Sequence, residues 1–217
     1  MLPFSTHQSF SSEQISLVRT GTDPDGNCFF HAYLYSVDPL YRDMDYPNRL
    51  QKALEIKKEF ANRVTVDDML DLIDVSLFET LQELIERHLK GYTLPDLSIQ
   101  PLLSLRGYLL LVYQSYPHLS REESFQYMIH MLQHEYHQRI LRYIIQNGTF
   151  MIDSYIDLFM KKMNVNIIMY SHQTGKPITH GIHYPVMYTI LMYHITDHFE
   201  SVGRFENGRV IRLFENN

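Results

Sequence analysis

Cys28 is the only cysteine among the 217 residues of the chain, and its surroundings suit a reactive thiol. It follows a turn-forming run, 22–27, and begins an apolar run, 29–35, that is compatible with a helix. A helix N-terminus offers unpaired N–H groups and the positive end of a dipole. Both favour the thiolate, which is the nucleophilic form of cysteine. The alternative is an inert, buried cysteine, the ordinary state of this residue type.

A reactive thiol needs a base, and the chain has 12 histidines that could supply it. His198 follows an apolar run, 188–195, that predicts a strand, so a sheet would hold its ring in place. Glu200 stands two residues further on and therefore on the same side of an extended segment. Its carboxylate could accept the imidazole N–H, as the orienting acid of a catalytic triad does. A His-x-Glu pair alone is ordinarily a surface hydrogen bond, but together with Cys28 it predicts a catalytic site.

The remaining histidines give weaker predictions. His130, His134 and His137 are spaced i, i+4 and i+7, which could place three imidazoles on one helix face, as a zinc site needs. No acidic or cysteine ligand must join them, so a polar helix stripe is the better interpretation. We therefore predict no metal and no cofactor. A predicted loop holds three more, which we expect to be solvated or to contact substrate: His172, His180 and His183.

Composition and charge indicate a soluble globular protein. Hydrophobic residues make up 45% and charged residues 20% of the chain, as is typical of that class. The formal charge of −6 disfavours nucleic acid as a partner, because phosphate binding needs clustered Lys and Arg. No run reaches the roughly 20 apolar residues of a membrane span, and the first residues do not resemble a signal peptide. One cysteine excludes an internal disulfide and fits a reducing, cytoplasmic compartment.

Hydrophobic patterning predicts an α+β protein, with helices over 28–163 and strands over 165–214. Thr65 is expected to cap a helix that begins at Val66. The expected helices are 28–36, 47–62, 66–90 (as one long helix or two short ones), 101–113, 121–146 and 152–163. The expected strands are 15–18, 165–170, 188–195, 198–202 and 209–214, with turns at 173–177 and 206–208.

Three blocks of the sequence resemble the ovarian-tumour (OTU) domain cysteine proteases. The first is Asp-Gly-Asn-Cys-Phe-Phe-His-Ala at 25–32, and the third is His-Phe-Glu-Ser-Val at 198–202. Between them, 148–170 resembles the Gly-containing turn, helix and central strand of that family. The blocks cover about residues 20–205 in the expected order. Two features depart from the family pattern: Glu200 stands where Asp or Asn is more usual, and 65–120 is richer in helix than a minimal member.

The resemblance implies a papain-like OTU fold, in which helices flank a small, mostly antiparallel central sheet. It implies one domain over 1–217, with 65–120 as a helical insertion, arm or enlarged lobe. The implied activity is hydrolysis of the isopeptide bond after the C-terminal Gly-Gly of ubiquitin. Cys28 would attack the carbonyl, His198 would take and return the proton, and Glu200 would orient His198. Asp25 would order the active-site loop or support the oxyanion hole; the alternative is a plain turn and cap residue.

Substrate contacts are expected at Gly26, Asn27 and Phe199, in a narrow slot walled by the loops 21–27 and 171–187. The helix at 66–90 is expected either to face ubiquitin or simply to pack on its neighbour. The implied partner is ubiquitin, a polyubiquitin chain or a ubiquitin-like modifier, with the protein acting as a monomer. The stand-alone length and helical region lean toward a viral or bacterial protein in a host cytosol. Two other classes stay open: an inactive ubiquitin-binding scaffold, and a hydrolase or acyl transferase for a small substrate.

Overall fold

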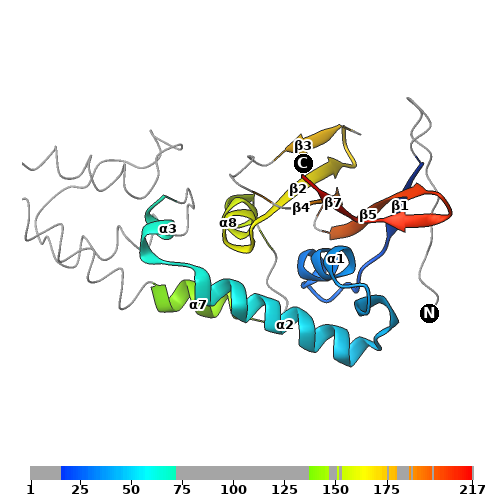
Figure 1. The fold of residues 1–217 in the computed structure, drawn as a ribbon. Helices are drawn as coiled ribbons and strands as arrows, with labels where there is room; N and C mark the ends of the chain where they lie inside the picture. The colour runs from blue at the N-terminus through cyan, green and yellow to red at the C-terminus, as the bar shows by residue number, and fades with distance from the viewer. Residues whose placement is uncertain are drawn as a thin grey trace, which may run out of the picture. The chain divides into compact units, whose positions relative to one another are not determined.

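The computed structural model describes residues 16–71, 137–146, 151, 153–174, 176–179, 186, 188–196 and 198–216. In these residues the chain forms helices and a seven-stranded sheet (Figure 1), so the predicted α+β class is confirmed. The chain divides into two compact units, one of residues 1–63 and 144–217 and one of residues 64–143. The single domain with an insertion at 65–120 stays a prediction, and most of that range lies outside the described residues.

The sheet belongs to the first unit and has the order β1-β5-β4-β2-β3, with β6 beside β5 and β7 beside β4. Every pairing is antiparallel except the one between β2 and β4, so a mostly antiparallel sheet is confirmed. The strands are β1 Ser16–Thr20, β2 Val165–Ser171, β3 Pro177–Thr179, β4 Tyr188–Ile195, β5 His198–Glu206, β6 Arg209–Ile211 and β7 Leu213–Glu215.

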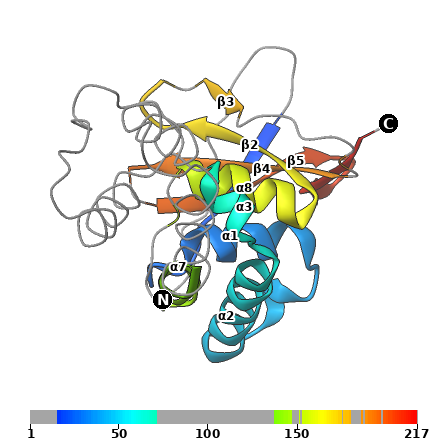
Figure 2. The same cartoon turned by 90° about the vertical axis from the view of Figure 1, so that its left-hand side faces the viewer.

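Four helical segments of the first unit are described: α1 Cys28–Val37, η1 Tyr41–Asp43, α2 Tyr46–Arg63 and α8 Asp153–Met163. Helix α1 packs on β4 and β5, and α2 lies on the side of α1 away from the sheet (Figures 1 and 2). Helix α8 contacts both α2 and β2. Because α1 is enclosed between the sheet and α2, it is buried from Cys28 to Ser36, which explains why its sequence is apolar nearly all round.

Phe29 on α1 belongs to an aromatic cluster that joins α1, α8 and β5. Its ring meets those of Phe159 and Phe199 edge to face, at centroid distances of 5.1 and 5.4 Å. Phe30 meets Phe159 in the same way, at 5.8 Å. Edge-to-face pairs of this kind contribute about 0.5–1.5 kcal/mol each beyond the burial of their area. The cluster therefore fixes the start of α1 against the start of β5.

The last predicted strand, 209–214, is wrong as a single element, since the chain changes its pairing partner at Arg212. Before it, β6 pairs with β5, and after it, β7 pairs with β4. The Arg212 side chain is buried and donates from Nη2 to Thr20 Oγ1 at 2.6 Å. Gly203 on β5 permits this packing, because a Cβ there would lie only 2.3 Å from Val210 Cγ1 and 2.8 Å from Arg212 Cγ.

Two other strands differ from expectation. β5 extends to Glu206 instead of ending at 202, because its later residues pair with both β1 and β6. Pro177, the last residue of the expected turn 173–177, instead begins the strand β3, which the sequence did not predict. Strand β3 pairs only with β2 at the end of the strand order, the position in a sheet where proline is tolerated.

Of the second unit, the structure describes a short helix, α3 Val66–Leu70, and most of α7 His137–Ile145, whose last residues belong to the first unit. Because α3 ends at Leu70, with Asp71 as its C-cap, one continuous helix over 66–90 is wrong; the rest of that range lies outside the described residues. The predicted cap at Thr65 is confirmed. Its N–H donates to Asp68 Oδ2 at 2.7 Å, and Asp68 N–H donates to Thr65 Oγ1 at 3.3 Å, which forms a reciprocal capping box. The ring nitrogen Nε2 of His137 lies 2.8 Å from the Val64 carbonyl oxygen. His130 and His134 lie outside the described residues.

Among the helices that the structure describes, none is long and apolar enough to cross a membrane. Within the same residues, no group of three or more His, Cys, Asp or Glu side chains is placed to hold a metal ion.

Candidate active site

The segment 21–27 connects β1 to α1 and places Cys28 at the first position of the helix. Gly26 has φ +76°, a left-handed conformation that glycine adopts without the cost a side chain would bring. The chain thereby turns sharply just before the helix. The Cys28 side chain is 2% exposed, so it faces into the contact between α1 and the sheet.

The thiol of Cys28 is held by backbone N–H groups from two elements. The N–H groups of Cys28 and Phe29 belong to the start of α1, and the third, that of Phe199, belongs to β5. Burial raises the pKa of the thiol and outweighs these N–H groups, which lower it; the charge of Asp25 raises it further. The resting site therefore favours the neutral thiol, which must lose a proton before it can attack.

His198 is the first residue of β5 and directly precedes Phe199, whose backbone N–H meets the Cys28 thiol. Its Nε2 lies 3.2 Å from Thr22 Oγ1, and that hydroxyl donates to the Phe199 carbonyl oxygen at 2.6 Å. A hydroxyl has a single proton, so Thr22 can only accept from His198. This assigns the proton of the neutral ring to Nε2 and leaves Nδ1 with a lone pair, as a general base requires.

The burial of His198 also favours a neutral ring. Burial lowers its pKa; the Glu200 carboxylate raises it and the Arg19 guanidinium lowers it again. A neutral imidazole can accept the proton of a neutral thiol. Burial therefore favours the neutral thiol of Cys28 and the neutral imidazole of His198.

Glu200 has a different partner from the one predicted for it. Its Oε2 accepts from Arg19 Nε at 2.7 Å, and among the described residues no hydrogen bond joins Glu200 to His198. The register explains the pairing: β1 places Arg19 opposite Val202, which is on the same side of β5 as Glu200. The guanidinium of Arg19 also lies 4.1 Å from the centroid of the Tyr193 ring. Glu200 therefore acts on His198 through its charge, while Thr22 makes the hydrogen bond.

Thr22 is the site residue that the sequence did not reveal. It belongs to a run typical of turns, and 176 positions separate it from His198. The only local indication that Thr22 belongs to the site is its position between the end of β1 and Cys28. The pairing of β1 with β5, in which Thr20 is opposite Ser201, brings the two together.

Asp25 orders the loop before Cys28. Its Oδ1 accepts the Asn27 N–H at 2.9 Å, and its Oδ2 lies 3.0 Å from His31 Nε2 and 3.3 Å from the Tyr46 hydroxyl. Burial would raise the pKa of Asp25, but the hydrogen bonds from His31 and the Asn27 N–H outweigh it and leave that pKa below its ordinary value. Asp25 is an ionised carboxylate that shapes the loop.

The residues predicted to contact substrate lie next to the thiol, but two of their side chains are buried. Asn27 is 0% exposed, and its side-chain amide donates to the Asp25 carbonyl oxygen at 3.4 Å. Phe199 stacks on His194, with centroids 4.5 Å apart and planes at 6°. In this structure these residues, like Gly26, would meet a substrate through their backbone.

The buried side chain of Lys57 interacts through its charge with Asp25 and Cys28. Lys57 on α2 is 0% exposed, donates to the Gln146 carbonyl oxygen at 3.0 Å and lies 5.2 Å from the centroid of the Phe30 ring. Burial lowers its pKa to about 8, while the charges of Asp25 and Cys28 raise it. When protonated, Lys57 therefore favours the thiolate form of Cys28.

No family model matches the chain, and no curated protein matches it. Solved structures of OTU domains are similar to it over most of its length. An OTU domain in complex with ubiquitin is 10% identical, with 94% of this chain and 77% of that chain covered and a TM-score of 0.46. The viral OTU domain protease from Taggert virus is 15% identical, covering 95% and 88%, with a TM-score of 0.41. The OTU of Hazara virus bound to ubiquitin is 11% identical, covering 94% and 97%, with a TM-score of 0.36.

Proposed function

We propose that this protein is a thiol-dependent deubiquitinase that hydrolyses the isopeptide bond after the C-terminal Gly-Gly of ubiquitin. One observation carries the proposal: the thiol of Cys28 meets the Phe199 N–H, and the adjacent His198 has its Nε2 proton bound by Thr22. This leaves the unprotonated Nδ1 to serve as the base, on the residue next to the one whose N–H meets the thiol. The Asp-Gly-Asn-Cys block at 25–28 supports ubiquitin as the substrate through its resemblance to OTU proteases.

In the proposed reaction, His198 Nδ1 takes the proton of Cys28 Sγ, and the thiolate attacks the carbonyl carbon of the terminal glycine. The C–N bond then breaks while the imidazolium returns its proton to the leaving lysine amine. Water, with its proton taken by His198, hydrolyses the thioester and restores the thiol. The oxyanion would be met by the Cys28 N–H and the loop at Gly26, because the Asn27 N–H is bound by Asp25 Oδ1.

The burial of Cys28 bears on the choice of substrate. At 2% exposure the thiol admits only a slender chain, and a Gly-Gly tail has no side chains to obstruct its approach. Two of the similar solved structures are described as bound to ubiquitin. We further propose action as a monomer in a reducing cytosol, that of a host if the chain is viral or bacterial, where a single free thiol stays reduced.

A ubiquitin probe with a C-terminal electrophile tests the proposal. We expect it to label the wild-type protein covalently and not to label Cys28→Ala, as measured by the mass of the intact protein. Cys28→Ser is the matched control for shape, and thermal unfolding of both variants checks that the fold is kept. Binding of ubiquitin without labelling of the wild type would favour the scaffold instead. Neither binding nor labelling would point to a different acyl substrate.

A further inference from the structure

We propose that His31 is a positioning residue that holds the 21–27 loop in its active shape through Asp25. His31 stands three residues after Cys28 on α1 and is 0% exposed. It therefore has no access to a substrate, and any effect on the reaction must pass through its neighbours. The inference deepens the proposed function, since it concerns the loop that would face the oxyanion.

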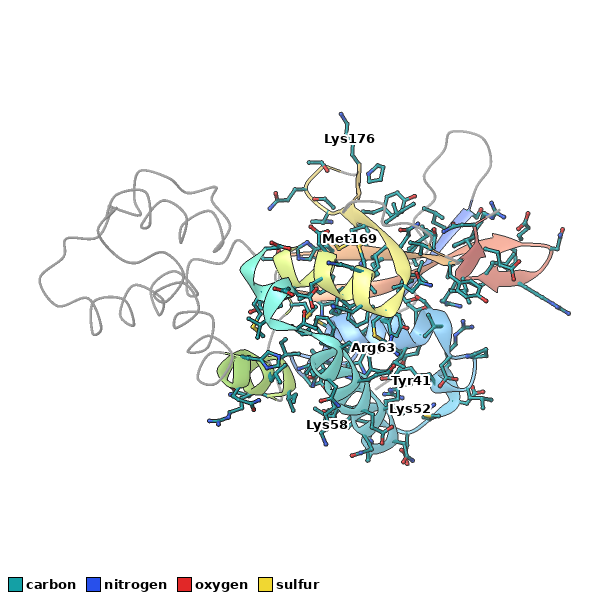
Figure 3. The ribbon with its side chains drawn as sticks, turned by 60° about the vertical axis from the view of Figure 1, so that its left-hand side comes forward. Tyr41, Lys52, Lys58, Arg63, Met169 and Lys176 are labelled. Carbon is teal, nitrogen blue, oxygen red and sulfur yellow. The ribbon has the colours of Figure 1, made fainter. Side chains whose placement is uncertain are left out.

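The hydrogen bonds of the His31 ring lead from the loop to α2. Nε2 faces both carboxylate oxygens of Asp25, at 3.0 and 3.2 Å, so it must carry a proton. Nδ1 meets the Tyr41 hydroxyl, which lies 3.1 Å from the carbonyl oxygen of Arg49 on α2. Burial raises the pKa of Tyr41, so its hydroxyl keeps its proton. Tyr41 lies between α1 and α2 (Figure 3), which places the connection within the packed body of the first unit.

The beginning of the loop is attached to the same body. Arg49 Nε and Nη2 donate to the two carboxylate oxygens of Asp23 at 2.8 and 2.9 Å, and Arg49 Nη1 donates to the Met44 carbonyl oxygen at 2.6 Å. A bidentate pair of this kind also fixes the direction of the carboxylate. The loop is thus held at Asp23 by α2 and at Asp25 by α1, with Gly26 as its turning point.

The hydrogen bond from His31 has a direct consequence for the backbone beside Cys28. Asp25 Oδ1, which His31 helps to hold, is the acceptor of the Asn27 N–H. Without the Nε2 proton, the half-buried charge of Asp25 would keep the hydrogen bonds from the backbone and side chain of Asn27 and from the exposed Tyr46 hydroxyl, but it would lose the partner on α1 that holds both of its oxygens. The carboxylate would then turn toward water, and residues 25–27 would lose the shape that presents the oxyanion donors.

Two amide variants separate the two nitrogens of His31. In His31→Gln the amide nitrogen reaches the place of Nε2 and keeps a donor toward Asp25. In His31→Asn it reaches only the place of Nδ1, keeps the contact with Tyr41 and loses Asp25. With a fluorogenic ubiquitin substrate, we expect His31→Asn to lower kcat about 30-fold at nearly unchanged KM, less than the roughly 10²–10³-fold loss on removing an oxyanion-hole donor itself, because the donors are displaced and not deleted. We expect His31→Gln to stay within about threefold of wild type.

A second measurement needs no enzymatic activity. The rate of alkylation of Cys28 by iodoacetamide reports the access to the buried thiol and the state of the backbone that directly precedes it. We expect it to rise about tenfold in His31→Asn and to change little in His31→Gln, at matched thermal stability. If the two variants behave alike in alkylation, the proposal for His31 is overturned. If they differ in alkylation while the wild type does not cleave ubiquitin, the proposed substrate fails and the role of His31 stands.

Discussion

The two sides of the candidate site are held by different means. On one side, the loop 21–27 has its carboxylates bound by side chains from the helices: Asp23 by Arg49, and Asp25 by His31 and Tyr46. On the other side, β5 is placed by the main-chain pairing of the sheet. Side-chain contacts near its first residues include a hydrogen bond from His198 to Thr22 and a partly exposed ion pair of Arg19 with Glu200.

This difference indicates which substitutions should have large effects on activity. A loop has no ladder of backbone hydrogen bonds, so its shape depends on individual side chains, and losing one of them changes the backbone. A strand keeps its shape when a side chain is changed, because its neighbours hold the backbone. On the β5 side we therefore expect large effects only from the base itself and from the group that orients it. Variants of His198, Thr22 and Glu200 test the β5 side, and the His31 variants test the loop.

His198→Ala has the largest expected effect. The substitution removes the proposed proton acceptor for Cys28 while β5 stays paired with β1 and β4. We expect turnover of a ubiquitin substrate to fall about 10³-fold or more, within the range of general acid–base catalysis. Single-turnover kinetics measures it, and an unchanged thermal midpoint serves as the control for folding. Full activity in this variant would refute His198 as the base.

Thr22→Val has an intermediate expected effect. Valine has nearly the shape of threonine but cannot accept the His198 Nε2 proton or donate to the Phe199 carbonyl oxygen. We expect kcat to fall about tenfold, the value of about one oriented hydrogen bond to the catalytic ring. Thr22→Ser is the matched control, because it keeps the hydroxyl and should recover most of the activity. Equal losses in the two variants would show that packing, and not the hydroxyl, is what matters at this position.

Glu200→Gln has the smallest expected effect, about a twofold change in kcat, because an ion pair at a partly exposed site contributes little. Its clearer readout is the pH profile. The Glu200 charge raises the pKa of His198 and the Arg19 charge lowers it. Removing Glu200 should therefore move the acidic limb of the profile to lower pH, and Arg19→Gln should move it to higher pH. Two results would make Glu200 the orienting acid. One is a shift of the acidic limb in the same direction in both variants, and the other is a loss of kcat in Glu200→Gln close to the loss in His198→Ala.

Much of the site could be predicted because its signals are local. The turn-forming run before Cys28, the apolar run after it and the strand before His198 all lie within a few residues of the element they specify. The cap at Thr65 was predictable for the same reason, since its partner Asp68 is three residues away. Confirmed helix starts lie within one residue of their predicted positions, at Cys28, Tyr46 and Asp153.

The features that could not be predicted depend on pairs of residues far apart in the chain. The partner of Glu200 is Arg19, 181 positions away, and that of His198 is Thr22, 176 positions away. The break at Arg212 depends on which strand lies beside each half of 209–215. Strand alternation correctly places His198 and Glu200 on the same side of β5, but it cannot say which residue of β1 comes to lie beside them.

By itself, the sequence determined the residue types of the chemistry: one cysteine at the start of a helix, a histidine at the start of a strand and a glycine-containing loop before the cysteine. Propensity and spacing act over a few residues, so they suffice for this. Only the tertiary structure decided the partners. The pairing of β1 with β5 gives Arg19 to Glu200 and Thr22 to His198, and the packing of α1 against α2 connects Asp25 through His31 to Tyr41. Hydrogen-bond partners follow from distance in space, which strand register and helix packing set.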